Sequence, residues 1–459
     1  MKDLTGKKIG ILGLGISGIS SFEFLKPIAK EIICWDDRNP EKLDDEFMIP
    51  LSDKRWQELD VIIISPGIPN SHDIFSLAHK HNILISSDIE TFLNNNSNSK
   101  IIAITGTNGK STTTSLIHHI LSKNDMDYHM GGNIGKSVLS LPQHKEGYVI
   151  ELSSFQLDLL QELNPDISVL LNITPDHTDR YSTNTEYCDS KKRILSKDGI
   201  NIIGTSGKDS CNIYENLRSE GEKRLIPIGK KYKNLSFRKS EASICEDYTE
   251  SQEIGISCTS NLLVDNFFDK ISYDIEPVKS LIGTHNQENI AASFAVCRSV
   301  GIMGKDIIKH LKTFQGLKHR MQFLGSRQNI HFYNDSKATN TDAAAASLSS
   351  LDNVLWLAGG VFKEKDLSAL DDAIKNIRKA YLFGKSKQLF ADYLQNNNVE
   401  YEVHDTMEDA FYASINELKE ELQYNILLAP ACSSFDQFRN FEERGDSFIE
   451  FYKKSITMQ

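Results

Sequence analysis

The stretch Ile101-Ile-Ala-Ile-Thr-Gly-Thr-Asn-Gly-Lys110-Ser-Thr-Thr-Thr114 decides the fold of the middle of this 459-residue chain. It opens with four apolar residues, which indicate a buried strand. Gly106 and Gly109 then predict a tight turn, and Lys110 and Ser111 begin a predicted helix. Strand, glycine turn and helix in this order form a cradle for a nucleotide phosphate. In such a cradle backbone N–H groups face the anion, the lysine reaches the terminal phosphates, and the hydroxyl can hold Mg²⁺.

The spacing of this loop departs from the usual one, which has a first glycine six residues before the lysine. Here that position is Ile104. Two interpretations follow: a shortened phosphate loop, or an ordinary strand–turn–helix with a chance Gly-Lys-Ser. The strand before the turn and the helix after it favour the phosphate loop, because the motif has meaning only in that setting.

Bulk properties limit the class of protein. The length predicts two to three domains. A net charge of −12 argues against a general nucleic-acid or membrane-surface binder, which would be basic. Seven scattered cysteines without a Cys-x-x-Cys motif indicate reduced thiols. Neither a signal peptide nor an apolar run of about 18 residues is present. We therefore expect a cytoplasmic protein that binds neither nucleic acid nor a membrane.

The first part of the chain carries a fingerprint of the dinucleotide-binding fold. A strand over residues 7–14 leads into Gly13-x-Gly15-x-Ser17-Gly18 and a predicted helix over 19–25. A second strand over 31–35 ends at Asp36-Asp37-Arg38, at the spacing of the ribose-binding acid. Taken alone, the pattern suggests NAD. A glycine turn specifies only a diphosphate on a helix end, however, so UDP would serve equally, and a purely structural turn is the plain alternative.

Other strands also end in residues that can meet a ligand, since ligands of α/β sheets bind at the carboxyl ends of strands. One apolar strand ends at Ser65-Pro-Gly67, for which a simple chain reversal is the alternative interpretation. Asn133 lies in the glycine turn 131–135. Glu151 ends the strand that follows. Nucleotide-cleaving phosphate-loop enzymes hold a metal-binding acid at that place. The alternative for Glu151 is a solvated glutamate.

Two further groups follow in the middle of the chain. His177 lies among Asp176, Asp179 and Arg180 after a predicted strand, which makes it a candidate metal ligand or general base, although a lone histidine is more often structural. A predicted helix over 187–195 carries two lysines and an arginine, for which a solvated basic face is the plain interpretation. Asn286 and Asn289 lie one turn apart on another predicted helix, where an Asn can also be a cap.

Two segments mark predicted domain boundaries: the polar run 94–99 and residues 316–320. Residues 200–280 carry no motif and are predicted to complete the middle sheet. Strand and helix signals alternate again towards the end, and we interpret Gly384-Lys385-Ser386 there as a turn. The predicted fold is α/β, with an N-terminal Rossmann-like domain (1–98), a central phosphate-loop ATPase-type domain (99–316) and a C-terminal Rossmann-like domain (317–459).

Three motifs together resemble the Mur ligases, the ATP-dependent amide ligases of peptidoglycan precursor synthesis, which share ancestry with folylpolyglutamate synthetase. They are the shortened loop 105–111, the stretch Asn334-Asp-Ser-Lys-Ala-Thr-Asn340, and Ala429-Pro-Ala-Cys-Ser-Ser-Phe-Asp-Gln-Phe438 with Phe441 and Arg444-Gly445. The resemblance covers all three domains. The last two motifs are similar to those of the branch that adds D-glutamate to UDP-N-acetylmuramoyl-L-alanine.

The resemblance implies roles for individual residues. The catalytic residues would be Lys110, Glu151, His177 and Lys191. ATP would be bound by Gly106, Thr107, Asn108, Gly109, Lys110, Ser111, Thr112, Asn286, Asn289, Arg320 and Asp335. The UDP-sugar would be bound by Gly15, Ser17, Asp36, Asp37, Arg38, Ser65, Gly67 and Asn133. D-Glutamate would be bound by Lys337, Thr339, Lys363, Ser434, Phe435 and Phe441. Two Mg²⁺ ions would be held by Ser111, Glu151, His177 and a carbamylated Lys191.

Two departures from the family pattern leave questions open. The segment before Lys191 is one residue short, so Lys192 is a rival for carbamylation. Val361 stands where a polar residue is expected, which leaves the role of Lys363 open. The implied chemistry passes the ATP γ-phosphate to a carboxylate, after which an amine attacks the acyl phosphate. Such steps need cations around the phosphoryl group and a dry, closing cleft. We expect a monomer.

Two other classes of function remain as alternatives. A nicotinamide-dependent oxidoreductase would use the segment from Gly13 to Asp36 and leave Lys110 and Ser111 unexplained. A nucleotide-gated binding module would use Lys110 without an amino-acid site. Within the ligases, a sibling Mur ligase or a folate ligase is the nearest alternative.

Overall fold

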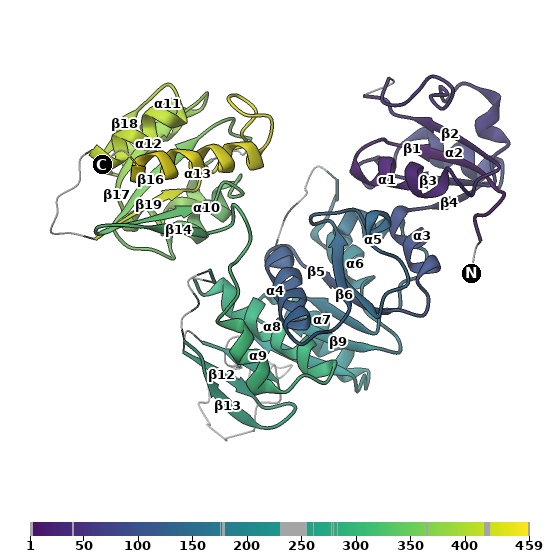
Figure 1. Ribbon diagram of the computed structural model, residues 1–459, viewed down its shortest axis with the longest axis horizontal. Helices are drawn as coiled ribbons and strands as arrows, with labels where there is room; N and C mark the ends of the chain where they lie inside the picture. Colours follow the sequence, from purple (N-terminus) through teal and green to yellow (C-terminus); the bar gives the residue numbers. More distant parts are fainter. Residues whose placement is uncertain are drawn as a thin grey trace, which may run out of the picture. The chain divides into compact units, whose positions relative to one another are not determined.

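The computed structural model describes residues 3–38, 41–174, 176, 180–229, 255–259, 261–276, 278, 280–281, 283–363, 366–416 and 423–457. The predicted metal ligand His177 lies outside the described residues. Contacts divide the chain into two units, residues 1–275 with 287–311 and residues 276–286 with 312–459. The first unit holds two β-sheets and the second unit holds one, and helices flank each sheet (Figure 1). The predicted α/β fold with three sheets is thus confirmed, whereas the exact domain limits stay a prediction.

The first sheet is parallel, in the order β2-β1-β3-β4. Its strands are β1 (Lys8–Leu12), β2 (Glu31–Trp35), β3 (Val61–Ile64) and β4 (Leu84–Ser86). Its helices are α1 (Ile16–Leu25), α2 (Asp73–Lys80), α3 (Asp88–Asn95) and the 3₁₀ turn Lys54–Gln57. Alternate residues of β1 and β3 enter two apolar clusters, one containing Ile9 and Ile63 and the other Leu12 and Ile62. Burial on both faces explains why these strands read as continuous apolar runs.

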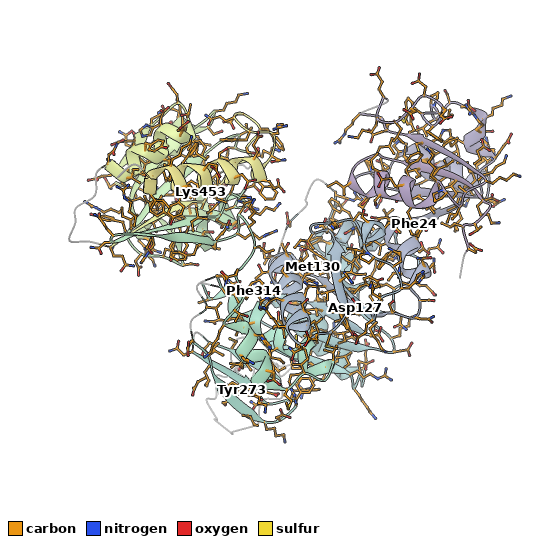
Figure 2. The ribbon with its side chains drawn as sticks, viewed as in Figure 1. Phe24, Asp127, Met130, Tyr273, Phe314 and Lys453 are labelled. Carbon is orange, nitrogen blue, oxygen red and sulfur yellow. The ribbon has the colours of Figure 1, made fainter. Side chains whose placement is uncertain are left out.

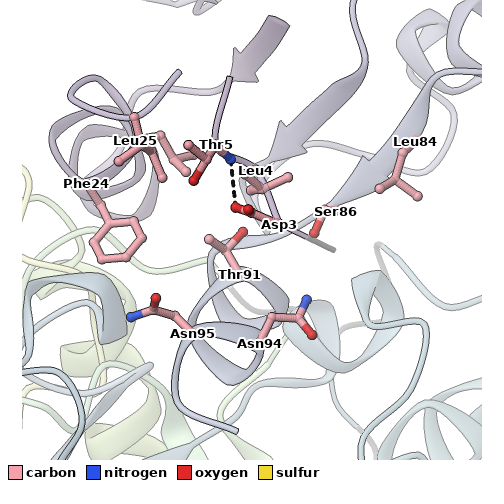
Figure 3. Close-up of a pocket in the computed structure, with 11 residues that line it drawn as sticks. Asp3, Leu4, Thr5, Phe24, Leu25, Leu84, Ser86, Thr91, Asn94 and Asn95 are labelled. Atoms are coloured by element: carbon pink, nitrogen blue, oxygen red, sulfur yellow. Dashed lines mark hydrogen bonds between the residues drawn. The ribbon is translucent and has the colours of Figure 1, made fainter. Parts of the chain in front are cut away.

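A cavity of about 390 Å³ opens at the end of β1 that lies away from the glycine turn. Leu25 lines it from the end of α1, Leu84 from β4 and Asn94 from α3 (Figure 3). Ile28, in the turn after α1, also lines it. Among the described residues that line this cavity, none belongs to a predicted site.

The central sheet has the order β13-β12-β11-β10-β9-β8-β5-β7-β6, and only the pairs β11–β12 and β12–β13 are antiparallel. Its strands are β5 (Lys100–Thr105), β6 (Tyr128–Gly132), β7 (Gly147–Glu151), β8 (Ile167–Leu170), β9 (Ile200–Gly204), β10 (Leu225–Gly229), β11 (Ile256–Cys258), β12 (Leu262–Asp265) and β13 (Ile271–Asp274). Since β9 to β13 extend this sheet, the prediction that residues 200–280 complete it is confirmed for the described residues.

Helices flank the central sheet, and side chains fill the space between the helices and the sheet (Figure 2). The helices are α4 (Lys110–Lys123), α5 (Ser154–Leu159), α6 (Asn184–Lys192), α7 (Lys208–Ser219), α8 (His285–Ser299), α9 (Gly304–Leu311) and the 3₁₀ turn Val138–Ser140. The helix predicted over 187–195 begins earlier, at Asn184, because the Thr183 side chain caps it by accepting the Glu186 N–H. None of the helices in the described part of the chain is long and apolar enough to cross a membrane.

The third sheet has the order β14-β15-β19-β16-β17-β18 and is parallel apart from β14. Its strands are β14 (Gln322–Arg327), β15 (Ile330–Asn334), β16 (Val354–Gly359), β17 (Ile377–Phe383), β18 (Tyr401–Val403) and β19 (Tyr424–Leu428). Its helices are α10 (Thr341–Leu348), α11 (Lys387–Asn396), α12 (Met407–Asn416), α13 (Phe441–Thr457) and the 3₁₀ turns Ser368–Leu370 and Ile374–Asn376. This order makes the carboxyl ends of β15, β19 and β16 neighbours.

The segment Gly384-Lys385-Ser386 is a turn between β17 and α11. Gly384 has φ +74°, and the Asp436 carboxylate accepts the Lys385 N–H at 2.9 Å. The prediction of a turn is therefore confirmed.

Candidate active site

The loop between β5 and α4 has the conformation expected of a phosphate loop. Gly109 precedes the helix with φ +84°, and a Cβ at this position would lie 2.2 Å from Asn289 Oδ1. Only glycine meets both conditions. The Asn172 main-chain oxygen accepts the Thr107 N–H at 2.8 Å, and its side-chain Oδ1 accepts the Asn108 N–H at 2.9 Å. Sequence reasoning missed Asn172, because nothing local marks it as a partner of a loop 64 residues away.

The Lys110 ammonium lies over this loop. Its Nζ atom donates to the carbonyl oxygens of Gly106 at 2.9 Å and Thr107 at 2.7 Å. Ser111 follows in the first turn of α4 and is 5% exposed. A helix N-terminus, a glycine turn and a cation at one place suit a phosphate group.

Glu151, at the carboxyl end of β7, fits a cation. Strand register pairs it with Ile104 of β5, just before the loop, and its side chain is buried. Oε1 accepts a hydrogen bond from Asn133 Nδ2 at 3.1 Å, whereas Oε2 has no partner among the described residues. A buried carboxylate oxygen without a donor favours a bound cation such as Mg²⁺. Within the described ranges no group of three or more His, Cys, Asp or Glu side chains lies close enough together to hold a metal ion.

Lys191 and Lys192 lie in very different environments. Lys191 is 1% exposed, its Nζ donates to the Gly106 carbonyl oxygen at 2.8 Å, and it lies 4.6 Å from the centre of the Tyr187 ring. Burial, and then the charge of Lys110, lowers the pKa of Lys191 to about 7. Lys192 instead pairs with Asp189 at 3.0 Å on the surface. Only Lys191 therefore faces the phosphate loop.

The glycine turn of the first sheet is held together by predicted site residues. The Asp36 carboxylate accepts the Leu14 N–H at 2.6 Å, and the Ser65 hydroxyl donates to the Gly13 carbonyl at 2.7 Å. A Cβ on Gly18 would lie 1.9 Å from the Gly13 oxygen, so α1 packs directly against the turn.

The remaining residues predicted for the UDP-sugar spread around this turn. Ser17 lies in the first turn of α1, after Gly15. Asp37 receives a hydrogen bond from Trp35 Nε1 at 2.9 Å and pairs with His72 at 3.1 Å. Arg38 and Gly67 lie at the surface. Asn133 instead lies beside Glu151, where its side chain donates to the carboxylate.

From the sequence, Arg180 is only a neighbour of the candidate His177, and the structure shows its contacts. Its Nη1 donates to the Pro66 carbonyl oxygen at 3.0 Å, and its guanidinium lies 4.0 Å from the centre of the Phe155 ring. It thus ties the segment after β8 to the loop after β3, which carries two predicted UDP-sugar residues. No sequence signal reveals this contact.

The six residues predicted for the amino acid lie on loops after β15, β16 and β19 and at the start of α13. The Lys337 Nζ lies 4.2 Å from the centre of the Phe441 ring, and the Lys363 Nζ lies 5.1 Å from that of Phe435. Thr339 follows Lys337 and bonds to its carbonyl at 2.8 Å, and Ser434 is 2% exposed.

Val361 explains how a valine can replace the expected polar residue. Its N–H donates to the Ser433 carbonyl at 2.9 Å, and its own carbonyl accepts the Ser433 N–H at 3.1 Å. The Ser433 hydroxyl donates to the same Val361 carbonyl at 2.9 Å. The loop of Lys363 is therefore joined to the loop of Ser434 through the backbone of Val361, and the side chain at 361 is not needed for that contact.

The other predicted ATP residues divide between the units. Asn289 lies in the first unit, where its Oδ1 accepts the Thr113 hydroxyl at 3.2 Å behind the loop. Asn286, Arg320 and Asp335 belong to the second unit. There Asp335 is buried and receives a hydrogen bond from Ser347; burial raises its pKa, against the Ser347 bond and the charge of Arg320.

Comparison with known proteins places the chain among the enzymes that it resembles. The family model of the Mur ligase middle domain matches residues 104–297, and that of the Mur ligase glutamate ligase domain matches 319–432. The UDP-N-acetylmuramoylalanine–D-glutamate ligase of Rickettsia bellii is 43% identical over 97% of both chains. The chain belongs to the Mur ligase family. The ligase of the same name from Wolbachia pipientis is 36% identical over 97% of this Mur ligase and 96% of its own chain.

Solved structures agree on the fold. The UDP-N-acetylmuramate-alanine ligase MurC of Thermotoga maritima has a TM-score of 0.59 at 16% identity and covers 98% of this chain and 100% of its own. The MurF ligase of the same organism, solved with ADP, has a TM-score of 0.57 at 16% identity, with coverage of 100% and 99%. The described residues of this Mur ligase therefore share the fold of these structures.

Proposed function

We propose that this Mur ligase joins D-glutamate to UDP-N-acetylmuramoyl-L-alanine at the expense of ATP, in peptidoglycan precursor synthesis. The observation that carries the assignment is the similarity, at 36–43% identity over about the whole chain, to relatives named UDP-N-acetylmuramoylalanine–D-glutamate ligase. The amide-ligase class follows from the family. The phosphate loop, the glycine turn and the lysine-bearing loops of the third sheet support one role each, for ATP, for the UDP-sugar and for the amino acid.

The first step transfers a phosphoryl group. A carboxylate oxygen of the alanyl group attacks the γ-phosphorus of ATP, the bond from that phosphorus to the β,γ-bridging oxygen breaks, and ADP leaves. Lys110 and the N-terminus of α4 are placed to bind the phosphates and to offset the charge that spreads over the transferred group.

The second step forms the amide. The amine nitrogen of D-glutamate attacks the acyl carbon, a tetrahedral intermediate forms, phosphate leaves with the electron pair of the C–O bond, and the nitrogen loses its proton. Lys337 and Lys363 supply two ammonium groups for a substrate that carries two carboxylates. The D configuration rests on the names of the relatives.

Mg²⁺ and the modified lysine belong to the same proposal. When bound, Mg²⁺ would neutralise phosphate charge, and Glu151, Ser111 and a carbamylated Lys191 are the described residues that would hold it. Addition of CO₂ to the neutral Lys191 amine would form an N–C bond and release a proton, which turns a cation into an anion. The burial of Lys191 beside the Gly106 carbonyl supports this residue over Lys192. The count of two ions, the monomeric state and the cytoplasmic location are proposed with it.

The test is a substrate panel. The protein is incubated with ATP and Mg²⁺, with phosphate release measured for UDP-N-acetylmuramoyl-L-alanine and for UDP-N-acetylmuramic acid, each paired with D-glutamate, L-glutamate, L-alanine, L-lysine and diaminopimelate. Release that requires the alanyl acceptor and D-glutamate together supports the proposal. A preference for another pair contradicts it.

A further inference from the structure

Arg444, in the first turn of α13, is a fully buried cation. None of the ion pairs among the described residues involves it. Burial lowers the pKa of Arg444 to about 10, so the side chain still carries its charge at neutral pH. Burying a charge without a counter-charge is unfavourable unless oxygen atoms surround it closely. The oxygens that Arg444 contacts therefore indicate its role.

Those oxygens come from two loops that are far apart in the sequence. Arg444 Nε donates to the Ser336 hydroxyl at 2.9 Å, and Nη2 donates to the Ser336 carbonyl at 2.8 Å. Nη1 donates to the Cys432 carbonyl at 3.0 Å. Ser336 follows β15 and Cys432 follows β19. One rigid, planar group thus joins the two loops, which a single ammonium could not do with the same geometry.

Both loops carry residues of the proposed amino-acid site. Ser336 directly precedes Lys337, and Cys432 lies two residues before Ser434. The Ser336 hydroxyl also donates to the Phe441 carbonyl at 2.8 Å, and the Phe441 ring lies beneath the Lys337 ammonium. A shift of the guanidinium would therefore change how the Lys337 ammonium, the Ser434 hydroxyl and the Phe441 ring lie relative to one another.

We propose that Arg444 is a positioning residue for the amino acid: it holds the Lys337 loop and the Ser434 loop in one geometry, so that the two can bind a dicarboxylic amino acid together. This inference rests on the proposed function, which assigns D-glutamate to these loops. In a site preorganised in this way, less of the binding free energy is lost in ordering the loops. Loss of the Arg444 contacts should therefore weaken binding of the amino acid selectively.

The experiment compares Arg444→Met, Arg444→Lys and Ser336→Ala in the full chain, with KM measured separately for D-glutamate, ATP and the UDP-sugar. The matched control is Arg439→Met, since Arg439 lies five residues earlier in an exposed pair with Glu443 at 3.1 Å. Arg444→Met should raise the KM for D-glutamate roughly 10- to 100-fold, the range expected when hydrogen bonds to a charged group are lost. The other two variants should raise it less, and Arg439→Met should leave all three constants unchanged.

Thermal unfolding separates this role from a general structural one. If Arg444→Met does not fold, Arg444→Lys and Ser336→Ala decide the question, because each keeps a polar contact at the junction. A lowered Tm with an unchanged KM for D-glutamate, or equal rises in all three KM values, would overturn the inference. A wild-type preference for another amino acid would contradict the proposed function. In that case a selective rise in KM for the preferred amino acid would still support the role of Arg444.

Discussion

The Lys191 ammonium and the Lys110 ammonium both donate to the same acceptor, the carbonyl oxygen of Gly106, at 2.8 and 2.9 Å. The last turn of α6 is thereby joined to the phosphate loop. Burial lowers the pKa of Lys191, and repulsion between the two like charges at one oxygen lowers it further. Conversion of Lys191 to a carbamate would replace this repulsion with attraction and keep the contact between helix and loop.

The first prediction concerns this lysine. Lys191→Ala should be nearly inactive, and formate or acetate should restore part of the activity, because a small carboxylate can occupy the space of the lost carbamate. Phosphate release with increasing carboxylate concentration measures the rescue. Lys192→Ala is the matched control, since the Lys192 side chain pairs with Asp189 on the surface. Rescue of Lys192→Ala instead of Lys191→Ala would transfer the modification to the neighbouring residue.

The second prediction concerns the phosphate loop. Lys110→Met should lower kcat roughly 100- to 1,000-fold, as loss of one preorganised charge-stabilising group does in other enzymes. Binding of UDP-N-acetylmuramoyl-L-alanine, measured by calorimetry, should stay nearly normal. Lys123→Met, at the exposed end of the same helix, should behave as the wild type. Undiminished turnover of Lys110→Met would leave an ordinary strand–turn–helix as the correct interpretation.

The third prediction concerns the glycine turn of the first sheet. In Gly18→Ala the new methyl group would collide with the Gly13 carbonyl, which lies 1.9 Å from an ideal Cβ. The start of α1 must then move away from the turn, so binding of the UDP-sugar should weaken strongly while ATP binding, followed with a fluorescent analogue, persists. Lys110→Met, which should keep UDP-sugar binding, and Gly18→Ala, which should keep ATP binding, are therefore controls for each other. Loss of ATP binding in Gly18→Ala would show general misfolding and not a local effect.

The parts of the site that the sequence predicted are local patterns. The phosphate loop, the glycine turn and Glu151 at a strand end each follow from a short run of residues whose backbone geometry is nearly dictated by glycine and by apolar strands. The prediction of α6 also placed its two lysines on a helix, although only the fold shows which of them faces inward.

The parts that escaped prediction are contacts between distant segments. Asn172 holds the phosphate loop, Arg180 contacts the loop after β3, and Arg444 joins loops that lie 108 and 12 residues away. The register of each sheet determines such contacts, and a single sequence does not contain that register. Val361 illustrates the same limit, because its backbone joins two loops at a position where the sequence pattern led us to expect a polar residue.

The fourth prediction concerns the choice of amino acid. Lys363→Ala should raise the KM for D-glutamate more than the KM for ATP or the UDP-sugar, because its ammonium would pair with one of the two substrate carboxylates. Leaving one substrate carboxylate without its ammonium partner costs about 1–3 kcal/mol of binding free energy. Lys453→Ala, which removes an exposed lysine paired with Glu450 on α13, is the control. Equal rises for all three substrates would show that Lys363 has a structural role only.

The last prediction concerns Asp88, the first residue of α3. Its side chain is 2% exposed, Oδ1 has no partner among the described residues, and the carboxylate is hydrogen-bonded to Ser17. Burial raises the pKa of this carboxyl above its ordinary value, against the hydrogen bond from Ser17. The folded state therefore holds this proton more tightly than the unfolded chain. It follows that the contribution of Asp88 to stability falls as the pH rises through these two pKa values.

Asp88→Asn removes the buried charge while keeping the shape of the side chain. Its Tm should exceed that of the wild type at about pH 8, and the gain should be smaller at acidic pH, where the wild-type carboxyl holds its proton. Asp73→Asn is the matched control. Asp73 is also the first residue of a helix, α2, that flanks the first sheet, but its side chain is exposed. That variant should gain no stability at either pH. A Tm gain of Asp88→Asn that is equal at both pH values would show that titration of the buried carboxyl does not cause the gain. A loss of Tm that grows with pH would show that the carboxylate stabilises the fold through its charge.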